Sequence, residues 1–238
     1  MIVIKNLKKV YQNFSLDIEN FEVNKGEFIS IVGQSGSGKS TLLNILARIE
    51  TGYSGEVSIN GDISMVFQDS LLLPHLNIFE NVAFGLRIKK INKNEINDRV
   101  NDVLKKLEIY NLKDRYPSEI SGGEKQRASI GRALVMNPQL LLMDEPFSAL
   151  DESLRERLQE VVKKLQRELG LTIIFVTHDR EEAFYLSDRI ALINKGKIEQ
   201  FDTAMHLYSM PNSDYVYNFL GLENIVIKDD QMYRKIKM

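Results

Sequence analysis

The sequence has 238 residues, of which 43% are hydrophobic and 27% charged, and its formal net charge is -2. These values are typical of a globular protein with one large domain, and the missing basic excess disfavours nucleic acid as a partner. The sequence contains no cysteine, which excludes disulfides and thiolate metal sites and fits a reducing compartment.

The first 60 residues alternate short apolar runs with turn residues, which predicts a strand-rich region. The apolar runs cover residues 2–4, 14–18, 28–32 and 57–59. No signal-peptide core precedes them, and no apolar run in the sequence reaches the roughly 18 residues of a transmembrane helix. Any membrane role is therefore expected to come from a partner.

Residues 93–109 have a helical pattern, because their apolar residues fall on one face. Pro117 then interrupts the chain. Ser121 is expected to cap the next helix, and Glu124, three residues later, completes a capping-box pattern.

The second half of the chain alternates predicted strands and helices. Residues 140–143 and 172–176 are apolar runs typical of buried parallel strands. Between them, residues 154–169 form an amphipathic helix that ends at Gly170. Residues 190–193 and 197–200 then form a hairpin. This order predicts an α/β fold with a largely parallel core.

A glycine-rich segment follows the strand at 28–32 and precedes a helical run, and it matches the phosphate-binding P-loop pattern at every fixed position. The segment consists of Gly33, Gln34, Ser35, Gly36, Ser37, Gly38, Lys39, Ser40 and Thr41. Its glycines let the backbone wrap a phosphate, and the helix N-terminus adds its positive dipole. Lys39 would reach the β- and γ-phosphates, and the Ser40 hydroxyl would bind Mg²⁺.

A P-loop needs a carboxylate from a neighbouring strand. The strand at 140–143 leads directly into Asp144 and Glu145, at the edge where ligands bind in open α/β sheets. Asp144 would hold Mg²⁺ through water. Glu145 would orient or deprotonate the attacking water, since phosphoryl transfer depends mainly on positioning and charge.

With these motifs in place, the sequence from about residue 1 to residue 221 resembles the ATP-binding subunits of ABC transporters. The segment that begins Ser121, Gly122, Gly123, Glu124 resembles the family signature, whose commonest form is LSGGQ. Ile120 replaces the leucine and Glu124 the glutamine, but the Ser-Gly-Gly core that binds phosphate is kept. This motif separates ABC ATPases from other P-loop enzymes.

Further family motifs follow in the expected order. Gln68 resembles the Q-loop glutamine, which touches Mg²⁺ and the water, and Asp151 ends a segment that resembles the D-loop of the dimer interface. His178 resembles the switch histidine that contacts the γ-phosphate. Tyr11 resembles the aromatic residue that stacks on adenine, with Phe14 as an alternative. His75 and His206 match no motif and are interpreted as ordinary residues.

The resemblance implies a P-loop NTPase core with a mainly parallel sheet, an antiparallel β subdomain and an inserted α-helical subdomain. It places the ATPase domain at residues 1–222, with the helical insertion at about 69–135. It also implies that one subunit holds half a site, so that Ser121 and Gly123 face the ATP held by Lys39 of a second copy. The dimer would be head to tail about a twofold axis.

The stretch 71–82 is apolar enough either to belong to the core or to dock on a partner. The resemblance favours docking on transmembrane permease subunits, at the cytoplasmic face of a bacterial or archaeal membrane. The sequence is similar to importers of ferric iron, polyamines, inorganic oxyanions and sugars, which implies an external solute-binding protein as well.

The sequence departs from those importers in two respects. The connector at residues 62–64 is shorter than usual, and only a tail at 223–238 stands where a C-terminal regulatory β-domain is common. Residues 225–227 and 232–236 are expected to form one hairpin. Regulation through such a domain and the class of solute therefore stay open.

Two other functions are compatible with parts of the sequence. An exporter-type or lipoprotein-releasing ATPase would have the same ATP chemistry, and only its membrane partners would distinguish it. A soluble ABC ATPase acting on DNA or ribosomes fits less well, because the sequence has neither sustained heptads nor a second ATPase half.

Overall fold

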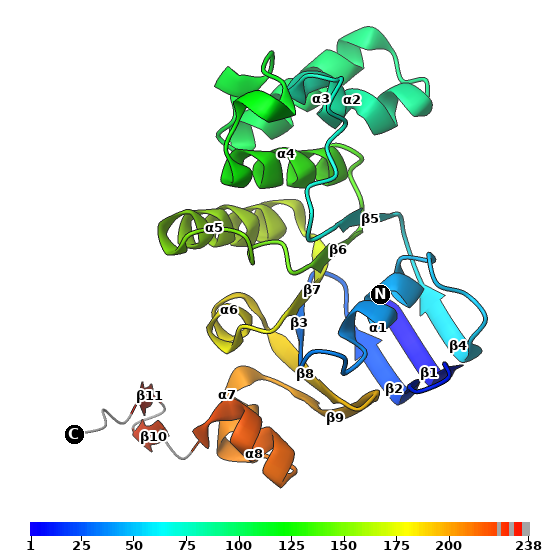
Figure 1. Cartoon of the computed structure of the whole chain (residues 1–238), viewed down its shortest axis with the longest axis vertical. Helices are drawn as coiled ribbons and strands as arrows, with labels where there is room; N and C mark the ends of the chain where they lie inside the picture. Colours follow the sequence, from blue (N-terminus) through cyan, green and yellow to red (C-terminus); the bar gives the residue numbers. More distant parts are fainter. Residues whose placement is uncertain (223–224, 229–230, 235–238) are drawn as a thin grey trace. The chain divides into compact units, whose positions relative to one another are not determined.

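The structure is a computed structural model that describes residues 1–222, 225–228 and 231–234 (Figure 1). It contains two compact units, each assembled from separate stretches of the chain. The helix-rich unit consists of Met1, Asn24–Gly26 and Asn60–Phe175. The P-loop unit consists of Ile2–Val23, Glu27–Ile59 and Val176–Met238.

The helix-rich unit contains a short parallel sheet and a group of helices. Strand β5 (Ile63–Val66) pairs in parallel with β6 (Leu140–Asp144), which neighbours β7 (Thr172–Thr177). The sequence of β6 is apolar because its first four residues are buried. The helices are α2 (Ile78–Ile88), α3 (Lys93–Lys106), α4 (Gly122–Leu134), α5 (Glu152–Leu169) and the short 3₁₀ helices η1 (Tyr110–Leu112) and η2 (Pro117–Glu119).

The P-loop unit contains an antiparallel sheet of order β2-β1-β4 and a second group of paired strands (Figure 1). In the second group, β3 lies parallel to β8, which forms an antiparallel hairpin with β9. The strands are β1 (Ile2–Val10), β2 (Ser15–Val23), β3 (Phe28–Val32), β4 (Ser54–Ile59), β8 (Arg189–Asn194) and β9 (Lys197–Asp202). The helices are α1 (Lys39–Leu46), α6 (Arg180–Leu186), α7 (Ala204–Ser209) and α8 (Asp214–Leu220).

The predicted α/β fold is confirmed, and one helix boundary differs. The apolar pattern at 93–109 predicts a longer helix than α3, which ends at Lys106. Glu108 has a φ of 58°, a left-handed conformation that stops a right-handed helix. Leu107 and Ile109 are still buried, because tertiary packing covers them after the helix has ended. The spacing of apolar residues therefore predicts which residues are buried, including two that lie beyond the end of the helix.

The tail forms the expected hairpin as far as the structure describes it. Strand β10 (Ile225–Lys228) pairs antiparallel with β11 (Gln231–Arg234). Residues 235 and 236, which the sequence also assigns to this hairpin, lie outside the described residues. Within the described part of the chain, every helix falls short of the length or apolar character needed to cross a bilayer.

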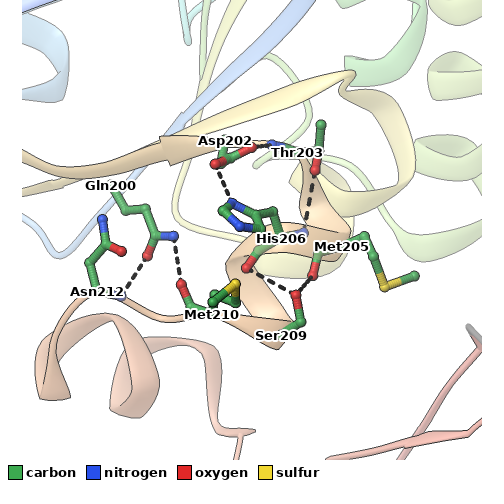
Figure 2. Close-up of polar contacts among 8 residues, drawn as sticks. All are labelled: Gln200, Asp202, Thr203, Met205, His206, Ser209, Met210 and Asn212. Atoms are coloured by element: carbon green, nitrogen blue, oxygen red, sulfur yellow. Dashed lines mark hydrogen bonds and ion pairs between the residues drawn. The ribbon is translucent and has the colours of Figure 1, made fainter.

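A polar network fixes α7 and the following turn on β9 (Figure 2). The buried Gln200 donates to the Met210 carbonyl at 2.9 Å and accepts from the Asn212 backbone N–H at 2.9 Å. Asp202 bonds the His206 ring. Partial burial acts to raise the pKa of the Asp202 carboxyl, but the bond with His206 helps to lower that pKa overall. His206 thus has a structural contact at the start of α7.

Candidate nucleotide-binding site

The P-loop begins at Gly33, where the buried strand β3 ends. A Cβ added at Gly33 would lie 2.2 Å from the Ile193 carbonyl oxygen of β8, so only glycine fits. Gly38 caps α1 with a φ of 109°, and a Cβ there would lie 2.8 Å from the Phe14 ring. These two close approaches shape the loop before any side chain contributes to binding.

The Lys39 ammonium lies inside this loop. It donates to the Gly33 carbonyl at 2.9 Å and to the Gln34 carbonyl at 3.0 Å, and the residue is only 7% exposed. The Ser37 hydroxyl is buried and has no hydrogen-bond partner in the described part of the chain. Ser40 is exposed in the first turn of α1. The fixed ammonium group of Lys39 and the N-terminus of α1 make this loop a suitable binding site for a phosphate.

The β8–β9 hairpin supports the loop from behind, a role that its turn sequence did not reveal. The Gly196 N–H donates to the Ser37 carbonyl at 2.9 Å, and the Gly196 carbonyl accepts from Asp17 at 2.7 Å. A Cβ at Gly196 would lie 1.8 Å from the Ser15 carbonyl oxygen, and its φ is 78°. A glycine in a hairpin turn was therefore the only sequence signal of this contact.

The two aromatic candidates for adenine stacking lie in different environments. Tyr11 is 40% exposed, and its backbone N–H donates to the Phe14 carbonyl at 2.7 Å. The Lys9 ammonium lies 5.3 Å from the centre of the Tyr11 ring. Phe14 packs against the loop at Gly38. Tyr11 is thus the more exposed of the two aromatic residues, and its role with adenine stays a prediction.

His178 comes directly after the last residue of β7, belongs to the P-loop unit and is exposed. The adjacent Thr177 hydroxyl accepts from the Asp179 N–H at 3.0 Å and donates to the buried Glu182 carboxylate at 2.7 Å. Asp179 caps α6, accepting from the N–H groups of Glu181 and Glu182. The turn that carries His178 is therefore well fixed.

In the helix-rich unit, three predicted motifs meet at the end of β6. Asp144 is the last residue of β6, and Glu145 follows with a φ of 42°. Such a conformation is rare for a residue with a side chain and is common at functional sites. The Ser148 hydroxyl lies 2.9 Å from the Glu145 carbonyl, and the Gln68 amide donates to that hydroxyl at 3.3 Å.

The signature segment lies at the N-terminus of α4, and the predicted capping box is present. The Ser121 Oγ accepts from the Glu124 N–H at 3.3 Å, and the Glu124 carboxylate accepts from the Ser121 N–H at 2.7 Å. A Cβ added at Gly122 would have no atom within 4 Å, whereas one at Gly123 would lie 3.3 Å from the Leu154 side chain of α5. One glycine leaves the surface accessible, and the other permits close helix packing.

Asp151 is the N-cap of α5. Its carboxylate accepts from the Leu154 N–H at 3.0 Å. The predicted D-loop segment therefore ends in a helix cap, which gives Asp151 a structural role whatever it contacts in a dimer.

Two side chains that the sequence did not single out hold the segment after Gln68. Arg132 of α4 donates to the Leu71 carbonyl at 2.6 Å and to the Ser70 carbonyl at 2.9 Å. Burial lowers the pKa of this guanidinium. Asn81 of α2 bonds Leu73 with both its oxygen and its nitrogen. These contacts hold the backbone at Leu71, where φ is 45°, and the Leu71 residue itself is 56% exposed to solvent.

The predicted site residues thus fall into two sets. The P-loop unit holds the segment Gly33 to Thr41, Tyr11 and His178, and the helix-rich unit holds Gln68, the signature, Asp144, Glu145 and Asp151. Across the described residues there is no cluster of three or more His, Cys, Asp or Glu side chains arranged to hold a metal ion.

A buried strand, a glycine loop closed around a lysine and a helix that starts at that lysine define a P-loop NTPase. Comparison with known proteins identifies the group within that class. The model of the ABC transporter family matches residues 16–148, which is more than half of the chain. The chain therefore belongs to the ABC transporter family.

Similar sequences include spermidine/putrescine import ATP-binding proteins PotA. The protein from Mannheimia succiniciproducens is 43% identical over 237 residues, covering 94% of this chain and 64% of the relative. The protein from Haemophilus influenzae is 44% identical over 237 residues, covering 94% of this chain and 64% of the relative. The chain thus spans less than two thirds of the length of these curated relatives.

Solved structures confirm the fold. The ATP-binding cassette MJ0796, described as a dimer in a post-hydrolysis state bound to ADP and Pi, has a TM-score of 0.76 and 33% identity. The match covers 85% of this chain and 98% of that one. The cbiO1 protein of Clostridium perfringens, part of the ABC transporter complex cbiONQ, has a TM-score of 0.82 and 28% identity. This match covers 91% of this chain and 94% of that one.

Proposed function

We propose that this chain binds and hydrolyses ATP and thereby powers an ABC transporter that imports a small solute. The observation that carries the proposal is the position of Lys39, whose ammonium is buried against the carbonyls of Gly33 and Gln34. A buried cation at the centre of a glycine loop suits the β- and γ-phosphates of a nucleotide. The buried Ser37 hydroxyl is a further polar group for them.

We propose that Ser40, Gln68 and Asp144 hold Mg²⁺. Their hydroxyl, amide and carboxylate oxygens are the hard donors that Mg²⁺ prefers, and Mg²⁺ sites commonly combine few protein ligands with phosphate oxygens and waters. When bound, Mg²⁺ neutralises charge on the phosphates.

Glu145 is the residue we assign to the attacking water. Its carboxylate would orient the water and accept its proton, and the constrained backbone at Glu145 supports a functional role. His178 would contact the γ-phosphate from its fixed turn, and Tyr11 would stack on adenine.

We infer that a second copy of the chain completes each site. Ser121, Gly122, Gly123 and Glu124 would approach the nucleotide across the interface, and the segment that ends at Asp151 would cross that interface. The accessible surface at Gly122 supports this arrangement, because a phosphate could reach the backbone there. The dimer described for MJ0796 also supports it.

The membrane partner is proposed to be a pair of permease subunits at the cytoplasmic face, served by an external solute-binding protein. Support comes from the exposed apolar side chains of Leu71, Phe84 and Ile88. We take residues 1–222 as one ATPase domain whose helical insertion spans about 69–135, because α2, α3 and α4 lie in that range. The names of the relatives make a polyamine the first solute to test.

The decisive experiment replaces Glu145 by glutamine. Glu145→Gln should still bind ATP, should lose at least about 100-fold in turnover as expected for a missing general base, and should accumulate as an ATP-bound dimer. Glu160→Gln, at an exposed glutamate of α5, is the matched control and should behave as wild type. Full turnover by Glu145→Gln would refute the role of Glu145. A wild-type protein that neither binds nor hydrolyses ATP would refute the function itself.

A further inference from the structure

The turn that carries His178 and the helix α6 behave as one piece, because hydrogen bonds join them at several points. Thr177 and Glu182 bond through their side chains at 2.7 Å, and the Asp179 carboxylate accepts from Glu181 at 2.8 Å and from Glu182 at 3.3 Å. Glu182 is only 7% exposed. Whatever fixes α6 therefore also fixes the backbone at His178.

Helix α8 has its own firm attachment in the same unit. Val216 and Leu220 are buried in an apolar cluster that also contains Val32, the residue before the P-loop, and Ala183 of α6. Gln200 of β9 holds the turn that leads into α8 by two hydrogen bonds (Figure 2). Because Val32 shares this cluster, α8 is positioned relative to the base of the P-loop.

Tyr215 adds a further contact between α8 and the interior of this unit. Burial raises the pKa of the Tyr215 phenol. The hydroxyl is buried and has no hydrogen-bond partner among the described residues. The side chain also packs against the apolar cluster around Val32.

Arg180 links these two pieces. It is the first residue of α6, two positions after His178, and its Nη1 donates to the Phe219 carbonyl at 2.8 Å. The last carbonyls of a helix lack partners within that helix, so this oxygen in the final turn of α8 suits an external donor. A Cβ at Gly221 would lie 2.9 Å from Nη1, so a glycine leaves room for the guanidinium.

We propose that Arg180 is a positioning residue, which ties the turn of His178 to α8 and so fixes His178 relative to the P-loop. The inference rests on the proposed role of His178 in ATP hydrolysis. Arg180 is not expected to touch the nucleotide. Its loss should therefore slow turnover and leave ATP affinity intact.

The test measures kcat and KM for ATP in Arg180→Gln and Arg180→Lys. Arg180→Gln should lower kcat about tenfold or more, the scale of one charge-assisted hydrogen bond, with KM and the Kd of a fluorescent ATP analogue within twofold of wild type. Arg180→Lys should restore most of kcat, because its ammonium still donates to a carbonyl. An unchanged kcat in Arg180→Gln would overturn the proposal, and so would an effect seen only as a higher KM for ATP.

Arg189→Gln is the matched control. Arg189 also donates to a carbonyl in the P-loop unit, that of Glu22 at 3.2 Å, and it pairs with Glu27 at 3.6 Å. Its loss should lower the melting temperature without changing kcat. A loss of kcat in Arg189→Gln equal to that in Arg180→Gln would show that general destabilisation explains both.

A double-mutant cycle separates this inference from the proposed function. If Arg180 acts through His178, Arg180→Gln should have little further effect in a His178→Ala background. An equal fold-loss in both backgrounds would overturn the role of Arg180 alone. A His178→Ala variant with wild-type kcat would overturn the role of His178, and the inference with it.

Discussion

Asn81 offers a sharp test of how the segment after Gln68 is held. The residue is fully buried in α2, and its Oδ1 accepts from the Leu73 N–H at 2.7 Å. Its Nδ2 lies 3.1 Å from the Leu73 carbonyl, 2.9 Å from that of Leu76 and 3.0 Å from that of Asn77. Two amide protons serve these three acceptors, so the side chain supplies about three hydrogen bonds in total.

The substitution Asn81→Ala removes all of these side-chain hydrogen bonds. At about 1 kcal/mol net for each bond, the loss is about 3 kcal/mol of unfolding free energy. For a chain of this size, each kcal/mol shifts the melting temperature by about 2–4 °C, so the expected decrease is about 6–12 °C. If permease subunits dock at Leu71 as proposed, the same change should also weaken that binding, because the loop that carries Leu71 loses its support.

Differential scanning calorimetry measures the shift, and Asn92→Ala is the control. Asn92 is an exposed cap whose oxygen accepts from the Glu95 N–H at 2.9 Å, so the same atoms are removed at an estimated cost of about 1 kcal/mol. A decrease for Asn81→Ala no larger than that for Asn92→Ala would refute the reasoning, since burial and bond number would then not determine the cost.

Two further substitutions test the support of the P-loop and of α8. Gly196→Ala should destabilise far more than Gly170→Ala in thermal melts and should also weaken ATP binding. A Cβ at Gly196 meets the Ser15 carbonyl at 1.8 Å, whereas at Gly170 nothing lies within 4 Å and only the left-handed backbone costs about 1–2 kcal/mol. Gln200→Ala should cost about 2 kcal/mol for two lost hydrogen bonds and should raise hydrogen exchange in residues 210–220. Unchanged exchange there would contradict the anchoring role of Gln200.

Local chemistry made many elements predictable. The capping box of Ser121 and Glu124, the helix end at Gly170 and the apolar strand at 140–143 each depend on neighbouring residues, and the structure contains all three. The P-loop was predictable for the same reason, because its pattern, its preceding strand and its following helix are contiguous. The catalytic roles assigned to Lys39 and its partners stay predictions until they are measured.

Other features join residues that are distant in sequence, and no local pattern signals them. Arg132 holds Leu71, the Gly196 turn supports the P-loop, and Arg180 reaches the end of α8. Arginines and turn glycines occur in any sequence, so their type alone did not distinguish these contacts.

The P-loop motif, the signature and the α/β order were determined by the sequence itself, because glycine conformations, helix caps and apolar periodicity act over a few residues. The support of the P-loop by Phe14 and Gly196, the left-handed Glu145 and the attachment of the His178 turn to α8 were decided only by the tertiary structure. These features depend on close approach between separate elements, which exists only once the chain has packed.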